Sequence, residues 1–280
     1  MLTTDQLDDL VKELVAAPTA DDRAELPGLD ASRADIILAG AVILEQVVHE
    51  LDLSEVIVSD YALREGVLLD TWRRRHGGSL HHLSELRRQS VLDLAELMDD
   101  DPPHSAQVAR LALELFDDTR DLHGLGDDAR EILEAAALLC NVGMFLSHAQ
   151  HHKHSYYVIR GTDRLTGFND DEVERIALVA RYHRKSEPKA RHSEFAALDD
   201  DAKHEVSVLA GLLRVATGLD RNHAARVQSV SVTTKDKGDR LLVMVTPTRG
   251  EDISLELYAA NARVGLLDIA LEVQTEVREA

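Results

Sequence analysis

The chain has 280 residues, of which 44% are hydrophobic and only 4% aromatic, and its formal charge at pH 7 is −20. This length accommodates two or three domains with their own cores, and the composition is typical of a soluble, mainly helical protein. The negative charge argues against general binding to nucleic acids or to anionic membranes, because both would repel the chain at long range. No apolar run reaches the roughly 18 residues of a membrane span, and the N-terminus lacks the pattern of a signal peptide. Together with a single cysteine, this predicts a cytoplasmic protein.

Residues 1–76 begin with an acidic, helix-like stretch, followed by turn residues at 26–30. Asp30 fits the N-cap of an amphipathic helix. The apolar positions of this helix recur with helical spacing at Ala34, Ile37, Leu38, Ala41, Leu44 and Val48. Residues 56–58 predict a short buried strand, and a further helix is expected over 61–72. A strand without a sheet would leave an edge that has to be paired or covered.

From 77 to 226 apolar residues recur with the helical period, which predicts a helical bundle. Helices are expected around 108–115, 129–137, 173–180 and 206–216. Asn169 followed by Glu172 has the pattern of a capping box, which marks the start of the third of these helices. His81, His82 and His123 have no matching partners in the sequence, so we expect them at the surface.

The last segment, 227–280, changes its period. Residues 227–234, 240–248 and 252–258 alternate or run apolar like strands, and the sequences KDKGD and RGED between them are turn signals. Residues 259–271 then predict a helix and 272–277 a final strand. The expected fold class is therefore α+β, mainly α, with a small α+β module at the C-terminal end.

Six blocks carry a resemblance to a known family. In chain order they are RADIILAGAVIL, VSDYALREGVLLD, EILEAAALL, HHKHSYYVI, LTGFNDDEVERIALVARYHRK and LLRVATGLDR. Their order resembles the C-terminal part of the exopolyphosphatase / guanosine pentaphosphate phosphohydrolase family, whose helical domain is a degenerate relative of the His-Asp metal phosphohydrolases. A series of ordered blocks, here extending over most of 27–221, is far more specific than any single one.

The resemblance implies three parts. Residues 1–76 would be the tail of the second actin-like (ribonuclease H-like) domain, an incomplete lobe; 77–226 a degenerate HD-like helical bundle; and 227–280 the small C-terminal domain. The family's catalysis uses glycine-rich phosphate loops of the D-x-G-S and D-x-G-G-G-S kinds, and neither pattern occurs in this sequence. We therefore expect no cofactor in this chain, and magnesium only together with a complete catalytic half.

A metal-dependent phosphohydrolase is a possible function that the His-Asp resemblance suggests. Such a site needs imidazole and carboxylate ligands at several corners of a divalent cation. By the resemblance His104 remains, whereas Cys140, Asn141 and Thr217 stand at the other three ligand positions. Asn and Thr are poor ligands, so we expect no metal, and we interpret Cys140 as a buried free cysteine in an Ala/Leu-rich helix.

Two basic blocks, HHKHS at 151–155 and RYHRK at 181–185, favour an anion site as the alternative to a metal site. Arg and Lys bind phosphate through charge-assisted hydrogen bonds, so a row of them could hold successive phosphates of a polymer. The candidate substrate-binding residues are His151, His152, Lys153, His154, Arg181, His183, Arg184, Lys185 and Arg214. Protonation of these histidines predicts tighter binding as the pH falls from about 7.5 to 6. The alternatives are a solvated basic face that pairs with the acidic surplus, and for Arg214 an ion pair with an acidic neighbour.

Two functions remain open at this point. One is the C-terminal part of a polyphosphate or guanosine pentaphosphate hydrolase, inactive alone, that binds polyphosphate or guanosine polyphosphate. The other is a non-enzymatic regulatory or interaction module. A homodimer is compatible with both.

Overall fold

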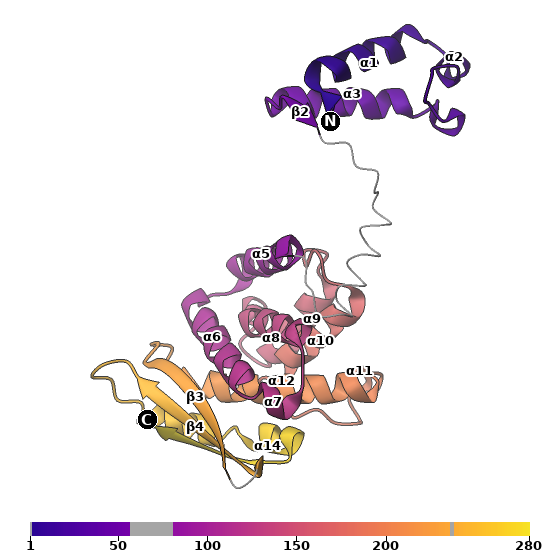
Figure 1. The fold of residues 1–280 in the computed structure, drawn as a ribbon. Helices are drawn as coiled ribbons and strands as arrows, with labels where there is room; N and C mark the ends of the chain where they lie inside the picture. The colour runs from indigo at the N-terminus through magenta and orange to yellow at the C-terminus, as the bar shows by residue number, and fades with distance from the viewer. Residues whose placement is uncertain (1, 57–80, 236–237) are drawn as a thin grey trace. The chain divides into compact units, whose positions relative to one another are not determined.

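The computed structural model describes residues 2–56, 81–235 and 238–280 (Figure 1). The chain divides into two compact units, 1–69 and 70–280. Both are mainly helical with small sheets, which confirms the predicted α+β, mainly α class. The predicted boundaries at 76–77 and 226–227 stay predictions. Among the described residues, no helix combines the length and the apolarity needed to cross a bilayer.

The N-terminal unit is a helical hairpin closed by a minimal sheet. Its described part consists of β1 (Leu2–Thr3), α1 (Thr4–Ala16), α2 (Ala20–Ala24), the 3₁₀ turn η1 (Ala31–Arg33), α3 (Ile37–Glu50) and β2 (Glu55–Val56). Thr3 caps α1 in a reciprocal capping box with Gln6. The expected strand begins at Glu55, but the expectation that it lacks a partner was wrong, because β1 pairs with it antiparallel, Leu2 opposite Val56. The helix predicted over 61–72 lies outside the described residues.

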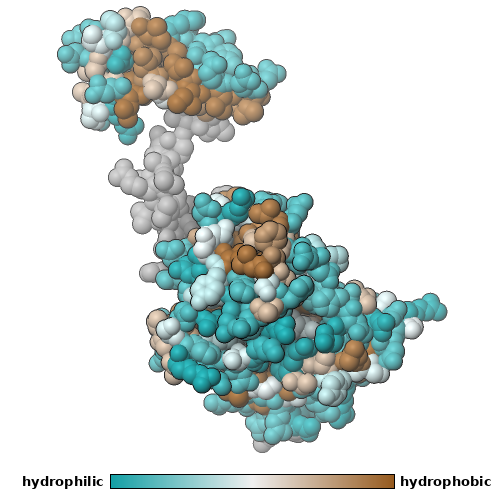
Figure 2. All heavy atoms as spheres, turned by 180° about the vertical axis from the view of Figure 1, so that it is seen from behind, coloured by the Kyte–Doolittle hydropathy of each residue, from teal (hydrophilic) through white to brown (hydrophobic). Residues whose placement is uncertain are grey.

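The α3 helix has the predicted helical spacing of apolar residues, but it begins at Ile37 and not directly after Asp30. Asp30 caps the 3₁₀ turn instead of the helix, by accepting a bond from the Ser32 amide. Val48 joins Leu7 and Val11 of α1 in a small core. The opposite side of α3 is exposed and apolar, and Figure 2 shows apolar surface over this unit.

A helical bundle forms most of the second unit, as predicted. Its elements are α5 (His81–Met98), α6 (Pro102–Asp118), α7 (Arg120–His123), α8 (Asp127–Leu139), η2 (Val142–Phe145), α9 (His151–Gly161), α10 (Asp170–Tyr182), α11 (Ser193–Ala196) and α12 (Asp200–Leu219). The predicted capping box of Asn169 and Glu172 opens α10. The α12 helix packs against α6, α8 and α10 (Figure 1). It is therefore the central element of the bundle.

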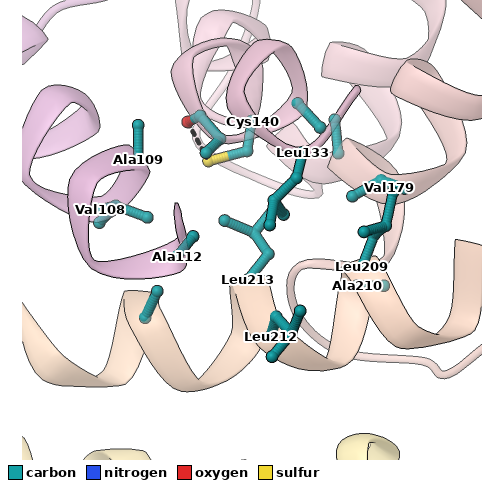
Figure 3. Close-up of a cluster of buried hydrophobic side chains, with 14 of the residues drawn as sticks. Val108, Ala109, Ala112, Leu133, Cys140, Val179, Leu209, Ala210, Leu212 and Leu213 are labelled. Carbon is teal, nitrogen blue, oxygen red and sulfur yellow. Dashed lines mark hydrogen bonds between the residues drawn. The ribbon is translucent and has the colours of Figure 1, made fainter. Parts of the chain in front are cut away.

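Cys140 lies at the centre of this bundle. Its side chain is fully buried beside Leu133 of α8, Val108 and Ala112 of α6, and Leu213 of α12 (Figure 3). The Sγ atom donates a hydrogen bond to the Ala137 carbonyl at 3.3 Å. Burial raises the pKa of this thiol to about 12. The interpretation of Cys140 as a buried free cysteine is confirmed.

The C-terminal module is a three-stranded sheet with two short helices. Strands β3 (Val227–Lys235), β4 (Arg240–Pro247) and β5 (Gln274–Glu279) lie in the order β3-β4-β5; the first pair is antiparallel and the second parallel. The strand predicted at 252–258 was wrong, because this stretch lies in α13 (Ser254–Asn261), followed by α14 (Gly265–Leu271). Asp252 accepts a bond from the Ser254 amide at the helix start, and Ile253 and Ala260 are buried.

Helix side chains cover both edges of this sheet. From α6, Glu114 and Asp118 accept bonds from the Val230 and Val232 amides of β3, at 2.9 and 2.8 Å. On β5, the Asn261 side chain exchanges two bonds with Val277, like a neighbouring strand. The covered edges attach the module to α6 and leave fewer free backbone groups for pairing with another chain.

Candidate anion site

A cavity of about 450 Å³ opens where the ends of several bundle elements meet the C-terminal module. The residues that line it are His104, Asn141, Met144, His151, His183, Arg184, Lys185, Arg214, Thr217, Arg221, His223, Ala262 and Arg263. They come from α6, the segment after α8, α9, the turn after α10, α12, the segment after α12 and the turn between α13 and α14. The cavity is therefore assembled from segments far apart in the sequence.

The lining carries a concentrated positive charge. It contains four arginines and one lysine, and no aspartate or glutamate is among its residues. Within the described ranges, Arg184, Lys185, Arg221 and Arg263 form no ion pair with a carboxylate. A chain with a formal charge of −20 has many acidic side chains to spare, so cations left without one are unusual and are suited to an anionic ligand.

Arg214 shapes the turn that presents two of these cations. Its Nε donates to the Tyr182 carbonyl at 2.7 Å, and one terminal nitrogen donates to the Lys185 and Ser186 carbonyls at 2.9 and 3.0 Å. These bonds hold the backbone of the turn, in which Lys185 adopts a left-handed φ of 62°. The carboxylate of Glu187 is 3.9 Å away. Arg214 thus bonds mainly to backbone carbonyls, with only a distant acidic partner, while it also lines the cavity.

His151 and His183 form a buried, neutral pair on the cavity wall. The Nδ1 of His183 donates to the Ala180 carbonyl at 2.6 Å, and the two Nε2 atoms lie 3.4 Å apart. Burial, and then nearby Arg184, lowers the pKa of His151 to about 4, and burial lowers that of His183 well below its ordinary value. Burial also lowers the pKa of His152 to about 4. The predicted tightening between pH 7.5 and 6 therefore does not follow from these three groups.

Three of the four positions that the resemblance compares with metal ligands, His104, Asn141 and Thr217, line the same cavity. The Nδ1 of His104 lies 2.7 Å from a carboxylate oxygen of buried Asp220, and its ring stacks on that of His223. Asn141 and Thr217 line the cavity, whereas Cys140 is directed into the core. Over 85–235 and 238–280, no three His, Cys, Asp or Glu side chains bring ligand atoms within 4.8 Å of one another; among the described residues such a group occurs at Asp8, Glu45 and His49 in the other unit. This donor set does not fit a His-Asp metal centre.

Two family models match the chain. A model described as "Ppx/GppA phosphatase, domain III" matches residues 86–259, which is more than half of the chain, and one described as "Ppx/GppA phosphatase family" matches residues 1–75. The chain belongs to the Ppx/GppA phosphatase family. The resemblance predicted from the ordered blocks is thereby confirmed.

Relatives in this family carry a common name. A guanosine-5'-triphosphate,3'-diphosphate pyrophosphatase from Pseudoalteromonas translucida (strain TAC 125) is 27% identical over 243 residues, which are 84% of this chain and 46% of the relative. Proteins of that name from Pseudoalteromonas atlantica (strain T6c / ATCC BAA-1087) and Aeromonas salmonicida (strain A449) are 27% and 26% identical, over 65% and 64% of this chain and 35% and 34% of their own lengths. The chain spans less than half the length of these relatives.

The cavity of this Ppx/GppA chain brings together five of the nine predicted ligand-binding residues. These are His151, His183, Arg184, Lys185 and Arg214. The other four, His152, Lys153, His154 and Arg181, do not line it.

Each of those four has other surroundings. His152 is buried, Lys153 is exposed and His154 is partly buried. Arg181 forms an ion pair with Glu194 at 3.2 Å and lies over the ring of Tyr156. The two basic blocks, 151–155 and 181–185, thus contribute only some of their residues to the cavity.

Sequence reasoning missed several lining residues and misplaced one histidine. Arg221 stands in a block that carried the resemblance, but Arg263 has no local signal, because only the packing of the C-terminal module brings it here. His123, expected at the surface, is buried. Its ring bonds to the Phe116 carbonyl and accepts from the Leu125 amide, so it ties the end of α7 to α6. The side chains of His81 and His82 lie outside the described residues.

Proposed function

We propose that this chain is part of a Ppx/GppA hydrolase that acts on guanosine pentaphosphate or polyphosphate, and that its basic cavity binds the phosphate-rich ligand. The names of the relatives support guanosine pentaphosphate as the substrate. Arginine and lysine side chains that converge without carboxylate partners support the ligand class. The second observation carries the proposal, because it concerns this chain's own residues.

In this proposal the chain binds and does not cleave. Residues 1–76 belong to an actin-like lobe, and 77–226 form a degenerate HD-like bundle whose former metal cleft has become the basic cavity. Asn141, Thr217 and the neutral His151–His183 pair leave room for an anion between the arginines. Phosphoanhydride hydrolysis needs a phosphate cradle and an activated water, and the family's glycine-rich loops do not occur in this sequence. Magnesium would act only in a complete catalytic half.

A second candidate is a non-enzymatic interaction module with no phosphate ligand. The observation in its favour is the apolar side of α3, where Ile43 and Val47 are 65% and 46% exposed. Contiguous apolar surface of this kind is typical of interaction sites. A metal-dependent HD phosphohydrolase is the least supported function, because Cys140 lies in the core and Asn141 and Thr217 are poor ligands.

Binding to long-chain polyphosphate tests the proposal. Labelled polyphosphate is titrated against the wild type, against Arg184→Ala/Lys185→Ala, and against Lys153→Ala/Arg191→Ala, which removes two positive charges outside the cavity. Charge-assisted bonds contribute about 1.5–3 kcal/mol each, so the cavity variant should bind at least about tenfold more weakly and the control nearly as the wild type. Equal affinities of the cavity variant and the wild type, or no binding by the wild type at low salt, would favour the interaction module.

Phosphate release tests the catalytic half of the proposal. The chain alone, supplied with magnesium and either polyphosphate or guanosine pentaphosphate, should release no phosphate above background. Release that persists through repurification and disappears on mutating a residue of this chain would contradict it.

A further inference from the structure

Arg263 reaches the cavity from the C-terminal module, whereas the other four cations of the lining belong to the bundle and the segment after α12. It stands in the short turn between α13 and α14. The only hydrogen bond that its side chain forms with the described residues is a long one, 3.4 Å, to the Ala259 carbonyl. The guanidinium is therefore free to bond elsewhere.

The position of this turn is set by close packing on α12. A Cβ atom added at Gly218 would lie 2.6 Å from the Ala260 Cα of α13, and one added at Gly211 would lie 2.9 Å from the Leu267 Cα of α14. Neither distance leaves room for a side chain. The two glycines thus let both helices approach the α12 backbone, and the turn that joins them is brought to the cavity.

The arginines that line the cavity lie close enough to repel one another. Burial lowers the pKa of Arg263, and so do the nearby charges of Arg221, Arg184 and Arg214. Within the described ranges no carboxylate pairs with Arg263 to offset this repulsion. An anion placed among these side chains would turn repulsion across the contact between module and bundle into attraction.

We propose that Arg263 is a ligand-binding residue that the C-terminal module supplies, and that a compact oligophosphate bridging it to Arg184 and Arg221 fastens the module to the bundle. This inference rests on the proposed function and adds to it the class of ligand and a structural response. The ligand needs several adjacent phosphates because its partners come from three separate segments. Orthophosphate, with a single phosphate, should bind far more weakly than tripolyphosphate.

Calorimetric titration of the full chain with tripolyphosphate and orthophosphate tests the binding role. Arg263→Gln should weaken tripolyphosphate binding at least tenfold, and Arg263→Lys should give an intermediate affinity because lysine keeps the charge without the planar fork. Exposed Arg249, in the same module but outside the cavity, supplies the control Arg249→Gln, which should bind as the wild type. Without ligand, Arg263→Gln should melt at a higher temperature than the wild type, a gain that a purely structural role would not give.

Gly218→Ala tests the same idea without removing a charge. The added methyl should displace α13 and weaken tripolyphosphate binding severalfold. Gly265→Ala is the matched control, since a Cβ atom there meets nothing within 4 Å. Hydrogen exchange reports the coupling: tripolyphosphate should slow exchange over 254–271 in the wild type and not in Arg263→Gln.

The outcomes separate the two proposals. Absence of any oligophosphate binding by the wild type would overturn the proposed function and this inference together. Binding by the wild type with equal affinity in Arg263→Gln, or with unchanged exchange over 254–271, would overturn only the inference. A tenfold loss in Arg263→Gln together with ligand-dependent protection in the wild type would support it.

Discussion

At the scale of single residues, burial decides what Cys140 can do. Its side chain is fully buried and hydrogen-bonded to a backbone carbonyl of its own helix. A thiol whose pKa is raised to about 12 carries almost no thiolate at neutral pH, and the thiolate is the form that reacts or binds metals. Cys140, which the resemblance places at a metal-ligand position, is therefore part of the core.

The reactivity and stability of Cys140 variants test this. The native chain should not react with a thiol reagent over hours at pH 7.5, whereas the urea-unfolded chain should react at once. Cys140→Ser places a hydroxyl in the core and should lower the free energy of unfolding by about 1–3 kcal/mol, measured by urea denaturation. Fast labelling of the native chain would show that the bundle opens around Cys140.

The buried histidines of the cavity make stability depend on pH. The pKa of His183 is lowered in the folded state, while an unfolded histidine titrates near 6.5. Above about pH 6.5 His183 is neutral in both the folded and the unfolded chain, so its titration does not affect the free energy of unfolding. Below that pH the unfolded chain takes up a proton at this histidine and the folded chain does not. The free energy of unfolding should therefore decrease as the pH is lowered below about 6.5, by up to about 1.4 kcal/mol per pH unit for each such histidine.

Urea denaturation at pH 7.5, 6.5 and 5.5 measures this slope. His183→Gln should reduce it by the share of one histidine, and His148→Gln, at an exposed position, should keep the wild-type slope. An equal slope in His183→Gln and the wild type would mean that His183 becomes protonated in the folded chain.

At the scale of elements, periodicity predicted the bundle but not the whole module. The helices α6, α8, α10 and α12 repeat apolar residues every three or four positions, and each was found. In α13 the stretch DISLELY alternates like a strand, yet it folds as a helix that packs against α12. Local pattern was here overruled by tertiary packing. For the same reason the sequence indicated the basic turn at 183–185 but not Arg263, whose place depends on how α13 and α14 pack.

The N-terminal unit offers an element-scale prediction. In the described part of this unit the hydrophobic cluster consists of Leu7, Val11 and Val48, whereas the cluster of the bundle contains many more buried side chains. Local opening costs less where few apolar contacts are lost, so amides of α1 and α3 should exchange faster than those of α8 and α12. Hydrogen exchange followed by mass spectrometry on a dilute sample measures this.

Self-association through the apolar side of α3 would slow hydrogen exchange in the N-terminal unit, so a variant that prevents it serves as the control. Ile43→Glu/Val47→Glu changes two exposed apolar side chains of α3 and should keep the monomer folded while it removes any protection gained by association. Exchange of α1 and α3 as slow as that of α8 in this variant would contradict the prediction.

At the scale of the whole molecule, two electrostatic effects of opposite sign act on an anionic ligand. The formal charge of −20 repels a polyphosphate at a distance, whereas the cations of the cavity attract it at contact. Salt screens the distant field first, because the Debye length is about 10 Å at 0.1 M and contacts of a few ångströms are screened much less. A negatively charged surface is therefore compatible with a basic cavity that binds anions. The surface charge should affect mainly the association rate constant, and the cavity contacts mainly the dissociation rate constant.

The rates of tripolyphosphate binding should show this separation. Between 20 and 150 mM sodium chloride the association rate constant should rise, because salt screens the repulsion that slows the approach. The dissociation rate constant should rise more, because ions compete with the contacts inside the cavity, so affinity should still fall. Stopped-flow mixing at several salt concentrations measures both constants, and Arg184→Ala/Lys185→Ala should flatten the salt dependence of dissociation. An association rate constant that falls steadily with salt would mean that the cavity's positive field extends beyond the acidic surface and steers the ligand inward.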